Sequence, residues 1–341
     1  MDTADRSRTA IALFSGGLDS ILACRLMMAQ GITVKAVRFV TPFFGYDLLA
    51  REEDYRREVA AEFGIDVQLR DLSGKYLLML RDPAHGYGKN FNPCVDCKIL
   101  IASEARLMME ELGASFIISG EVLGQRPMSQ RRDTLRIIEK ASGCEGILLR
   151  PLSALNLPET IPEQEGAVDR GRLLAFSGRT RQPQIALAAS FQIDDFPTPA
   201  GGCMLTDPNR AARVRRFYEE NETVAPADLL LLMIGRQFRL PDGGWLVLGR
   251  DESENNSLAD LLRPGDIFLW CEESWPGPSA VLRRSEGQRD LEAAAGLIKR
   301  YSKKGKGREL AIVSWQKVGD EKPAEIQVEP LADRDFQNWQ F

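Results

Sequence analysis

A regular alternation of strand-length apolar runs and helix-length stretches in the first 120 residues constrains the fold more than any other feature of this chain. Strands that alternate with helices of this length predict an α/β domain, a doubly wound parallel sheet with helices on both faces. Such sheets bind ligands beyond the carboxyl ends of their strands, so functional residues are expected just after each strand. The predicted strands cover residues 9–14, 34–40, 66–72 and 115–119, and the predicted helices cover 18–30, 50–63 and 98–112.

The pattern changes after about residue 225, where short strands replace the earlier alternation. A chain of 341 residues with 44% hydrophobic composition has enough apolar residues for two cores. We therefore predict a first domain over residues 1–225 and a separate C-terminal α+β domain over residues 226–341. In the second domain, strands are expected at 245–248, 266–270, 280–283 and 311–315, with a helix at 291–301.

Composition and charge exclude several classes of protein. The formal net charge of −5 excludes a chain that is basic overall, so any contact with nucleic acid must come from a local patch. No apolar run reaches the ~18 residues that a membrane span needs, and the first residues do not resemble a secretory signal, so we expect a cytoplasmic protein with no membrane partner. Six cysteines do not make a disulfide scaffold in a chain of this length. The single histidine, His85, gives little support to a Ser-His-Asp triad or a histidine-rich metal site.

A loop with two glycines follows the first predicted strand and leads into a predicted helix. Gly16 and Gly17 let the backbone turn sharply and bring N–H groups close to a ligand, and the start of a helix adds partial positive charge. Asp19 is suited to hold Mg²⁺ against bound phosphates. The alternative is an ordinary strand-to-helix turn with capping side chains. The expected phosphate-binding residues are Ser15, Gly16, Gly17, Leu18, Asp19 and Ser20.

The complete string Ser-Gly-Gly-Leu-Asp-Ser, placed between a strand and a helix, resembles the phosphate loop of the PP-loop ATP pyrophosphatases. Their fold is of the adenine nucleotide alpha hydrolase type. The resemblance implies that residues 15–20 bind ATP and that Asp19 is catalytic and holds Mg²⁺. It also implies cleavage of ATP between its α and β phosphates, with an adenylated intermediate and pyrophosphate as products.

A second segment follows the fourth predicted strand and has the sequence Gly-Glu-Val-Leu-Gly-Gln at 120–125, with Ser-Gln at 129–130. It is similar to a segment of the 4-thiouridine synthetase branch of the PP-loop family. Its position at the carboxyl edge of the sheet is one where side chains meet a nucleotide or substrate. The residues that the resemblance implies in cofactor binding are Gly120, Gln125, Ser129 and Gln130.

Three of the six cysteines, Cys94, Cys97 and Cys203, lie in turn-rich segments. Cys94 and Cys97 have Cys-x-x-Cys spacing where a loop enters a predicted helix. Three such thiols can play a structural role, bind zinc with a fourth ligand, form a disulfide relay that carries a persulfide, or bind a 4Fe–4S cluster. The loop expected to bring Cys203 to the pair contains Pro197, Pro199, Gly201 and Gly202.

A Cys-x-x-Cys pair before a helix and a later Pro-Ala-Gly-Gly-Cys are similar to those thiolating PP-loop proteins that use a three-cysteine cluster. The resemblance implies that Cys94, Cys97 and Cys203 are catalytic and ligate a 4Fe–4S cluster whose free iron binds sulfide. It favours the cluster over the persulfide relay, because both cysteines of the pair then have a role. Lys98 and Arg126 are further candidate phosphate contacts.

The last hundred or so residues contain short segments that, in their order, resemble the NFACT-R type of RNA-binding domain. Residues 277–279 read Gly-Pro-Ser where that family has Gly-Ser-His, so any role of the family's histidine is absent. Tyr301 is expected to stack on a base, next to a basic helix end. The alternative is a solvated helix end with favourable cations. The segments are 249–256, 264–270, 276–283, 293–295 and 301–304, and the basic residues are Lys299, Arg300, Lys303, Lys304, Lys306 and Arg308.

Together these resemblances imply an AMP- and pyrophosphate-forming tRNA sulfurtransferase that thiolates a uridine through an O-adenylated intermediate. The implied cofactors are ATP, Mg²⁺ and a three-cysteine 4Fe–4S cluster that delivers sulfide. The implied partners are tRNA and a sulfur donor, either free sulfide or a desulfurase, and a homodimer is one assembly that the sequence allows. A PP-loop ligase acting on a small molecule and an RNA-binding adaptor with an idle PP-loop domain are the alternatives. Segment 120–130 favours 4-thiouridine as the product, and 2-thiouridine remains open.

Overall fold

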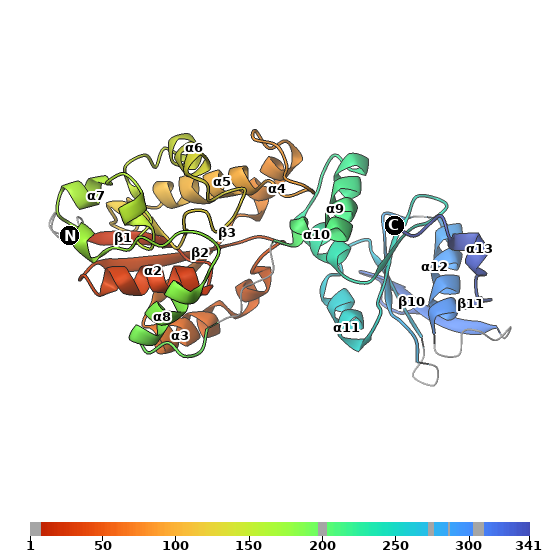
Figure 1. Ribbon diagram of the computed structural model, residues 1–341. Helices are drawn as coiled ribbons and strands as arrows, with labels where there is room; N and C mark the ends of the chain where they lie inside the picture. Colours follow the sequence, from red (N-terminus) through yellow and green to blue (C-terminus); the bar gives the residue numbers. More distant parts are fainter. Residues whose placement is uncertain (1–7, 197–202, 272–275, 286, 303–309) are drawn as a thin grey trace. The chain divides into compact units, whose positions relative to one another are not determined.

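The computed structural model describes residues 8–196, 203–271, 276–285, 287–302 and 310–341 (Figure 1). The chain divides into two compact units, Met1–Tyr218 and Glu219–Phe341. The division falls within helix α9 (Pro208–Glu220), and the domain boundary expected at residue 225 stays a prediction. Outside the described residues lie the predicted loop with Pro197, Pro199, Gly201 and Gly202, and the basic residues Lys303, Lys304, Lys306 and Arg308.

A five-stranded parallel sheet forms the centre of the first unit, in the order β3-β2-β1-β4-β5. The central strand β1 is apolar along nearly its whole length because helices cover both of its faces. Strand order reverses at β1, which pairs with β2 on one side and β4 on the other, so the crevice for a ligand is expected between the ends of β1 and β4. The strands are β1 (Thr9–Leu13), β2 (Thr33–Val40), β3 (Asp66–Asp71), β4 (Phe116–Ser119) and β5 (Leu148–Leu149).

Helices lie on both faces of this sheet, with α2 and α3 on one face and α5 and α6 on the other (Figure 1). Ala10 and Ala12 of β1 face the α2 side, whereas Ile11 faces Ala102 and Ala105 of α5. The predicted α/β class with a doubly wound parallel sheet is therefore confirmed. The helices are α2 (Leu18–Met28), α3 (Glu52–Phe63), α4 (Ser73–Arg81), α5 (Cys94–Leu107), α6 (Arg132–Ser142), α7 (Ile161–Gln164) and α8 (Gln182–Ser190).

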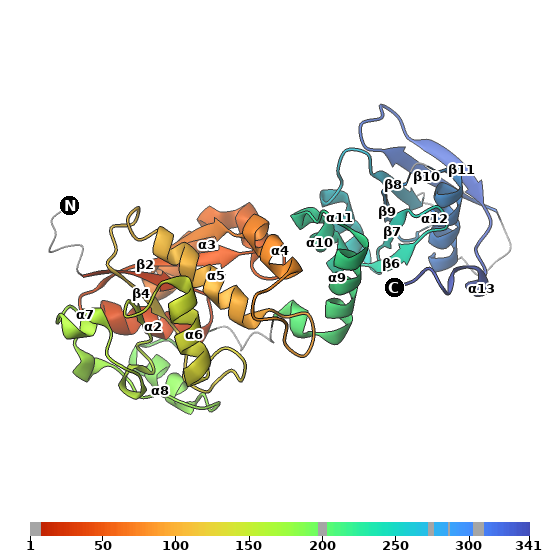
Figure 2. The same cartoon turned by 90° about the horizontal axis from the view of Figure 1, so that it is seen from above.

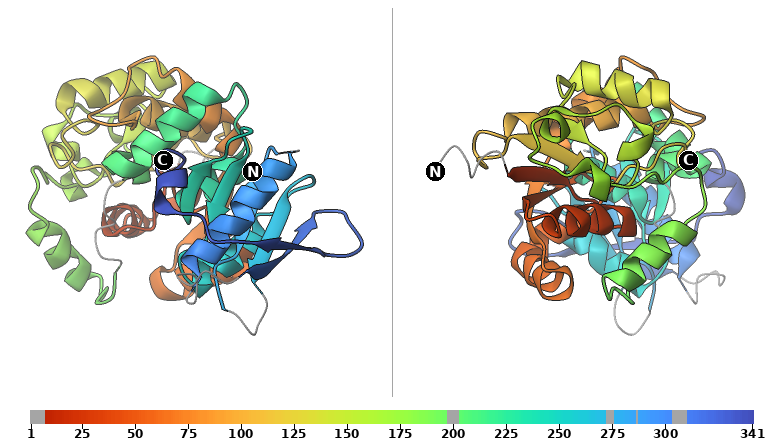
Figure 3. Two further views of the ribbon diagram at one scale, coloured as in Figure 1. Left: turned by 90° about the vertical axis from the view of Figure 1, so that its right-hand side faces the viewer. Right: turned by 60° about the vertical axis from the view of Figure 1, so that its left-hand side comes forward.

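The second unit contains a six-stranded antiparallel sheet in the order β11-β10-β8-β9-β7-β6, and the predicted α+β class is confirmed. Helix α12 covers one face of that sheet, where Ala294, Leu297 and Ile298 pack against strand residues (Figures 2 and 3). Across the described ranges, no helix combines the length and the apolar character needed to cross a membrane. The elements are α10 (Pro226–Met233), β6 (Arg236–Arg239), β7 (Trp245–Leu248), α11 (Glu252–Asp260), β8 (Ile267–Cys271), β9 (Ala280–Arg283), α12 (Gln288–Tyr301), β10 (Ala311–Lys317), β11 (Ala324–Val328) and α13 (Asp333–Phe336).

Candidate active site

Hydrogen bonds between serines and the backbone fix the shape of the loop between β1 and α2. Ser20 Oγ donates to the carbonyl oxygen of Gly17 at 2.7 Å and accepts a hydrogen bond from the backbone N–H of Ser15 at 3.3 Å. Gly16 has a φ of 75°, in the left-handed region that glycine enters without strain. Helix α2 begins at Leu18, so the positive end of its dipole lies at the loop. This arrangement suits an anion, and the contacts of residues 15–20 with ATP stay predictions.

Arg38 brings a positive charge to the same loop. A Cβ atom on Gly16 would lie 2.3 Å from Arg38 Nη1, so the guanidinium group rests directly against the glycine. Arg38 Nη1 donates to the Tyr55 hydroxyl at 2.6 Å, and the guanidinium carbon lies 5.1 Å from the centre of the Tyr55 ring. Arg38 was not singled out from the sequence, although a charged residue near the carboxyl end of an apolar strand was a signal for it.

Asp19 contacts the second predicted segment. Gln125 Nε2 donates to Asp19 Oδ2 at 3.1 Å, so the phosphate loop and segment 120–130 meet as predicted for one crevice. The other carboxylate oxygen, Asp19 Oδ1, is buried and finds no hydrogen-bond partner among the described residues. A buried carboxylate oxygen without a donor fits a hard cation, so Asp19 is suited to hold Mg²⁺ together with phosphate oxygens of a bound nucleotide.

Gly120 allows the end of β4 to approach the first turn of α2. A Cβ atom at this position would lie 2.4 Å from the Asp19 carbonyl carbon and 2.5 Å from the Ser20 backbone nitrogen. Both atoms belong to the backbone and cannot rotate away. Gly120 therefore fixes the spacing between the phosphate loop and the second segment, which is a structural role beside its predicted part in cofactor binding.

We expect Gly120→Ala to destabilise the chain by ~1–3 kcal/mol, because the added methyl group forces α2 and β4 apart. The variant should also bind ATP more weakly, since Asp19 and Ser20 are displaced. Chemical denaturation and ATP titration measure the two effects. Gly74→Ala is the matched control, because Gly74 lies within α4 and a Cβ atom there meets nothing within 4 Å. A Gly120→Ala protein as stable as the Gly74→Ala protein would contradict this role.

Ser129 and Gln130 are both buried, and Gln130 braces the second segment with hydrogen bonds. Gln130 Oε1 accepts from the backbone N–H of Arg126 at 2.9 Å, and the Gln130 carbonyl accepts from the N–H of Gly124 at 2.7 Å. These hydrogen bonds shape the loop that presents Gln125. Direct contact of Ser129 and Gln130 with a nucleotide stays a prediction.

Glu121 lies in a buried charged network behind this loop. Arg150 Nε donates to Glu121 Oε2 at 3.1 Å, and Lys98 Nζ lies 3.4 Å from Glu121 Oε1. Arg150 also pairs with Glu139. Burial alone would raise the pKa of Glu121, but Lys98 and Arg150 together hold that pKa below its usual range. Glu121 and Arg150 had no predicted role, and Lys98 was expected to contact a phosphate rather than a carboxylate.

Cys94 is the first residue of α5 and is linked to the second segment through Asn92. Asn92 Nδ2 lies 3.1 Å from Cys94 Sγ and 3.4 Å from Met128 Sδ. Met128 belongs to the same loop as Gln125, so one short segment contacts both the phosphate loop and the cysteine pair. Asn92 precedes the Cys-x-x-Cys motif by two positions and was not singled out from the sequence.

Cys97 and Cys203 share an environment with the buried hydroxyl group of Tyr76, on α4. Desolvation is the main reason why the pKa of the Cys97 thiol is raised to about 12; the neighbouring Cys203 and Cys94 thiols contribute to the rise, whereas Lys98 and a hydrogen bond with Tyr76 oppose it. Burial raises the pKa of Cys203 as well, with Cys94 adding to the effect. Each of the three thiols thus influences another, so the fold brings Cys203 into the neighbourhood of the pair.

The donor chemistry of this neighbourhood fits an iron–sulfur cluster, because such clusters are held by cysteine thiolates. The raised pKa values favour the protonated form of Cys97 and Cys203, and a bound metal would displace these protons. Within the part of the chain that the structure describes, no group of three or more His, Cys, Asp or Glu residues is arranged to hold a metal ion. The cluster and the ligand roles of the three cysteines therefore stay proposals.

The single histidine supports the cysteine pair through Asp96, which lies between the two cysteines. His85 Nδ1 lies 2.9 Å from Asp96 Oδ1, and the backbone N–H of His85 donates to Asp96 Oδ2 at 3.0 Å. Asp96 is buried, so this contact fixes the loop against the start of α5.

The basic end of α12 was predicted to contact RNA. The residues of it that the structure describes differ from this prediction. Lys299 is buried, with 2% of its surface exposed, and Arg300 Nη2 lies 2.8 Å from Asp333 Oδ1. The Tyr301 ring packs near Phe238 and Phe336, with centroid distances of 6.2 and 6.1 Å. These two basic residues and the tyrosine are engaged within the unit, so their predicted RNA contacts find no support in this geometry.

Comparisons with known families agree with both units. Residues 6–162 match the family described as thiamine biosynthesis protein (ThiI), and residues 235–340 match the NFACT protein RNA binding domain. A probable tRNA sulfurtransferase of Methanothermobacter thermautotrophicus is 36% identical over 118 residues, which cover 34% of this chain and 29% of the relative. A probable tRNA sulfurtransferase of Thermococcus kodakarensis is 28% identical over 152 residues, which cover 44% of this chain and 38% of the relative. The chain thus spans about a third of the length of these curated relatives.

Two solved structures are also similar. A 4-thiouridine synthetase in complex with RNA and bound ATP has 21% sequence identity and a TM-score of 0.35, over 66% of this chain and 52% of that one. The C-terminal part of the fibronectin/fibrinogen-binding protein of Streptococcus suis has 12% identity and a TM-score of 0.28, over 47% of this chain and 79% of that one.

Proposed function

We propose that this chain, which joins a ThiI-family domain to an NFACT-type RNA-binding domain, uses ATP to activate a uridine of tRNA and replaces one of its oxygens with sulfur. One observation carries the proposal. Segment 120–130 contacts the phosphate loop through Gln125 and Asp19, and contacts the cysteine pair through Met128 and Asn92. A nucleotide bound at the loop and thiols at the other end of this segment can then act on the same carbonyl group of the substrate.

The first half of the proposed reaction is adenylation. A carbonyl oxygen of uridine attacks the α-phosphate of ATP, the bond to the β-phosphate breaks, and pyrophosphate leaves. The backbone of Gly16 and Gly17 and the start of α2 would hold the phosphates, with Asp19 holding Mg²⁺ against them. Arg38, beside Gly16, supplies further positive charge for the departing pyrophosphate. Adenylation is needed because a carbonyl oxygen is a poor leaving group and AMP is a good one.

The second half of the proposed reaction is sulfur transfer. Sulfide adds to the activated carbon, the bond from that carbon to the adenylated oxygen breaks, and AMP leaves with the oxygen. Cys94, Cys97 and Cys203 would hold a 4Fe–4S cluster, which supplies an open iron that binds sulfide. Asn92 and Tyr76 orient the Cys94 and Cys97 sulfurs. A persulfide relay on the same cysteines is the competing route. The proposed sulfur donor is free sulfide or a desulfurase. The proposed compartment is the cytoplasm, where thiols stay reduced. A homodimer stays a prediction.

Loss of this protein is expected to remove one thiouridine from cellular tRNA. Mass spectrometry of nucleosides from a strain lacking the gene should show the loss, and chromatographic retention against authentic standards distinguishes 4-thiouridine from its isomer 2-thiouridine. Return of the intact gene should restore the nucleoside, whereas a gene with Asp19→Ala should not. A full set of thiouridines in the deletion strain, together with pyrophosphate release that needs a small molecule instead of tRNA, would favour a small-molecule ligase.

A further inference from the structure

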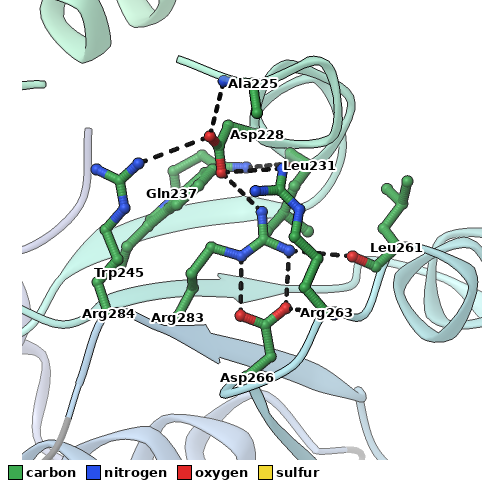
Figure 4. Close-up of polar contacts among 10 residues, drawn as sticks. All are labelled: Ala225, Asp228, Leu231, Gln237, Trp245, Leu261, Arg263, Asp266, Arg283 and Arg284. Atoms are coloured by element: carbon green, nitrogen blue, oxygen red, sulfur yellow. Dashed lines mark hydrogen bonds and ion pairs between the residues drawn. The ribbon is translucent and has the colours of Figure 1, made fainter. Parts of the chain in front are cut away.

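The two faces of the six-stranded sheet in the second unit are covered by different helices. α12 packs on one face, where Leu269 of β8 is fully buried. On the other face, Arg283 Nη1 of β9 donates to Asp228 Oδ1 of α10 at 2.9 Å (Figure 4). The backbone N–H of Ser279, which directly precedes β9, donates to Asn255 Oδ1 of α11 at 3.0 Å. α10 and α11 therefore cover the second face around β9.

Two aromatic residues of β8 point to this second face. Successive residues of a strand point to opposite faces, and Ile267, Leu269 and Cys271 pack against the core under α12. Phe268 and Trp270 therefore lie on the other face, and we call them the aromatic pair. Both side chains are half-buried, so part of each stays exposed to solvent.

Exposure on the second face increases from β9 toward β10. Val281 of β9, which pairs in register with Phe268, is fully buried, whereas the two rings of the aromatic pair are half-buried. On the far side of the pair, Ile312 of β10 is 43% exposed, and its register partner Gln327 on β11 is exposed as well. A ligand from solution can therefore reach the pair from the side of β10.

The aromatic pair forms a flat surface. The two ring centroids lie 5.6 Å apart, and the ring planes differ by only 26°. Rings that are close to parallel present their π faces in a common direction, and every nucleobase has a π face that can stack on them. Each aromatic side chain has only two rotatable bonds and is already held in the sheet, so little conformational freedom is lost on stacking.

Polar side chains border the aromatic pair. Gln316 and Ser314 of β10 pair in register with the two aromatic residues, and Gln316 Nε2 donates to the Asp320 carbonyl at 2.8 Å. Hydrogen-bonding groups next to a small aromatic surface suit a base, which combines a π face with polar edges. Glu325 of β11 is exposed and lies opposite Ser314, so its charge disfavours a phosphate at this edge. Bases rather than the RNA backbone are therefore expected to face the sheet.

We propose that the aromatic pair stacks with unpaired bases of RNA. The inference rests on the proposed function for its RNA partner, and the pair lies within the residues that match the NFACT protein RNA binding domain. Stacking of this kind tolerates any base sequence. It gives the RNA a contact that does not depend on the end of α12, where the Tyr301 ring packs inside the unit.

The test is binding of labelled oligouridine to the full chain across a salt series. The double variant Phe268→Leu, Trp270→Leu keeps apolar side chains on the sheet but removes both π faces, so it should bind roughly tenfold more weakly. The slope of log K against log salt should stay the same, because no phosphate contact is lost. Trp315→Leu is the matched control, since Trp315 lies on the neighbouring strand β10 but packs on the α12 side, and it should change neither quantity.

Fluorescence distinguishes direct stacking from an indirect effect. Stacking of a base on Trp270 should quench its indole fluorescence during the titration. Trp270→Phe keeps a ring, so this variant should retain most of the affinity and show less quenching. A purely structural role of the pair predicts a lower unfolding temperature with unchanged affinity. A protein-docking surface predicts that the double variant changes the oligomeric state, measured by light scattering, and leaves RNA affinity unchanged.

The outcomes separate this inference from the proposed function. If the intact chain binds neither tRNA nor oligouridine, the RNA partner of the proposed function fails. If it binds tRNA but not oligouridine, or if the folded double variant binds oligouridine with the parent affinity, only the aromatic pair fails. Should the double variant not fold, the Trp270→Phe protein decides, because quenching equal to that of the parent would contradict a base contact at Trp270.

Discussion

Replacement of Asp19 by alanine is expected to lower the rate of pyrophosphate release by at least ~100-fold, the size of effect seen when a preorganised electrostatic contact to a transition state is lost. Asp19 Oδ1 is buried without a hydrogen-bond partner in the described residues, so it is available to a cation. Without that carboxylate, Mg²⁺ loses its protein anchor when charge moves onto the leaving pyrophosphate. Pyrophosphate release in the presence of tRNA and ATP is the measurement.

Two further variants make this result specific. Asp47→Ala removes an exposed carboxylate from the same unit and should leave the rate unchanged. Gln125→Ala removes the donor to Asp19 Oδ2 but keeps the carboxylate, so we expect a smaller loss than with Asp19→Ala. The Asp19→Ala protein should unfold at a similar temperature to the parent, because its carboxylate accepts only one hydrogen bond within the site. A folded Asp19→Ala protein that releases pyrophosphate at the normal rate would contradict the proposed role of Asp19 in holding Mg²⁺.

The parallel sheet could be predicted because its central strands, β1 and β4, are buried on both faces and are therefore mostly apolar. β1 reads Thr-Ala-Ile-Ala-Leu and β4 reads Phe-Ile-Ile-Ser, whereas β2 is apolar apart from Thr33, Lys35 and Arg38. β5 was missed because it has only two residues, Leu148–Leu149, too few to show a period. α4, from Ser73 to Arg81, was missed because it follows β3 after a single residue and leaves no recognisable loop.

The phosphate loop and the cysteine motif could be predicted because each is a local string with its own chemistry. Arg38, Tyr76 and Arg150 could not be predicted in the same way, because their roles depend on contacts between elements. Arg150 meets Glu121 only because β4 and β5 are neighbours in the sheet. Tyr76 reaches Cys97 only because α4 places its hydroxyl group beside the start of α5.

Helical periodicity could have corrected the expected basic patch on α12. Leu291, Ala295 and Ile298 lie on the buried stripe of this helix, and Lys299 follows Ala295 by four positions on the same stripe. The charge of Lys299 suggested a position on the surface, whereas its spacing from the apolar residues of α12 indicates a position facing the core. Burial also extends beyond this stripe, because all seven positions from Ala293 to Lys299 are buried.

Loss of any one of the three cysteines is expected to remove the cluster and stop thiolation while sparing adenylation. Protein purified without oxygen should be brown and contain about four irons per chain, as a 4Fe–4S cluster requires. Cys94→Ser, Cys97→Ser and Cys203→Ser should each lower the iron content and abolish thiouridine formation. Single-turnover pyrophosphate release should continue in each, because the phosphate loop and Asp19 are unchanged. Cys271→Ser is the control, since Cys271 is half-buried in the other unit and should affect neither quantity.

The pattern across the three variants separates the cluster from a persulfide relay. A relay needs Cys203 and one cysteine of the pair, so it predicts colourless active protein in which one of Cys94 and Cys97, the one that the relay does not use, can be replaced without loss. The structure raises the pKa of Cys97 to about 12 by burial, which is unfavourable for a thiol that must attack as a thiolate at neutral pH. The same burial is compatible with a metal ligand, because coordination removes the proton. Full thiolation by iron-free protein would therefore contradict the cluster and favour a relay in which Cys94, rather than the deeply buried Cys97, acts with Cys203.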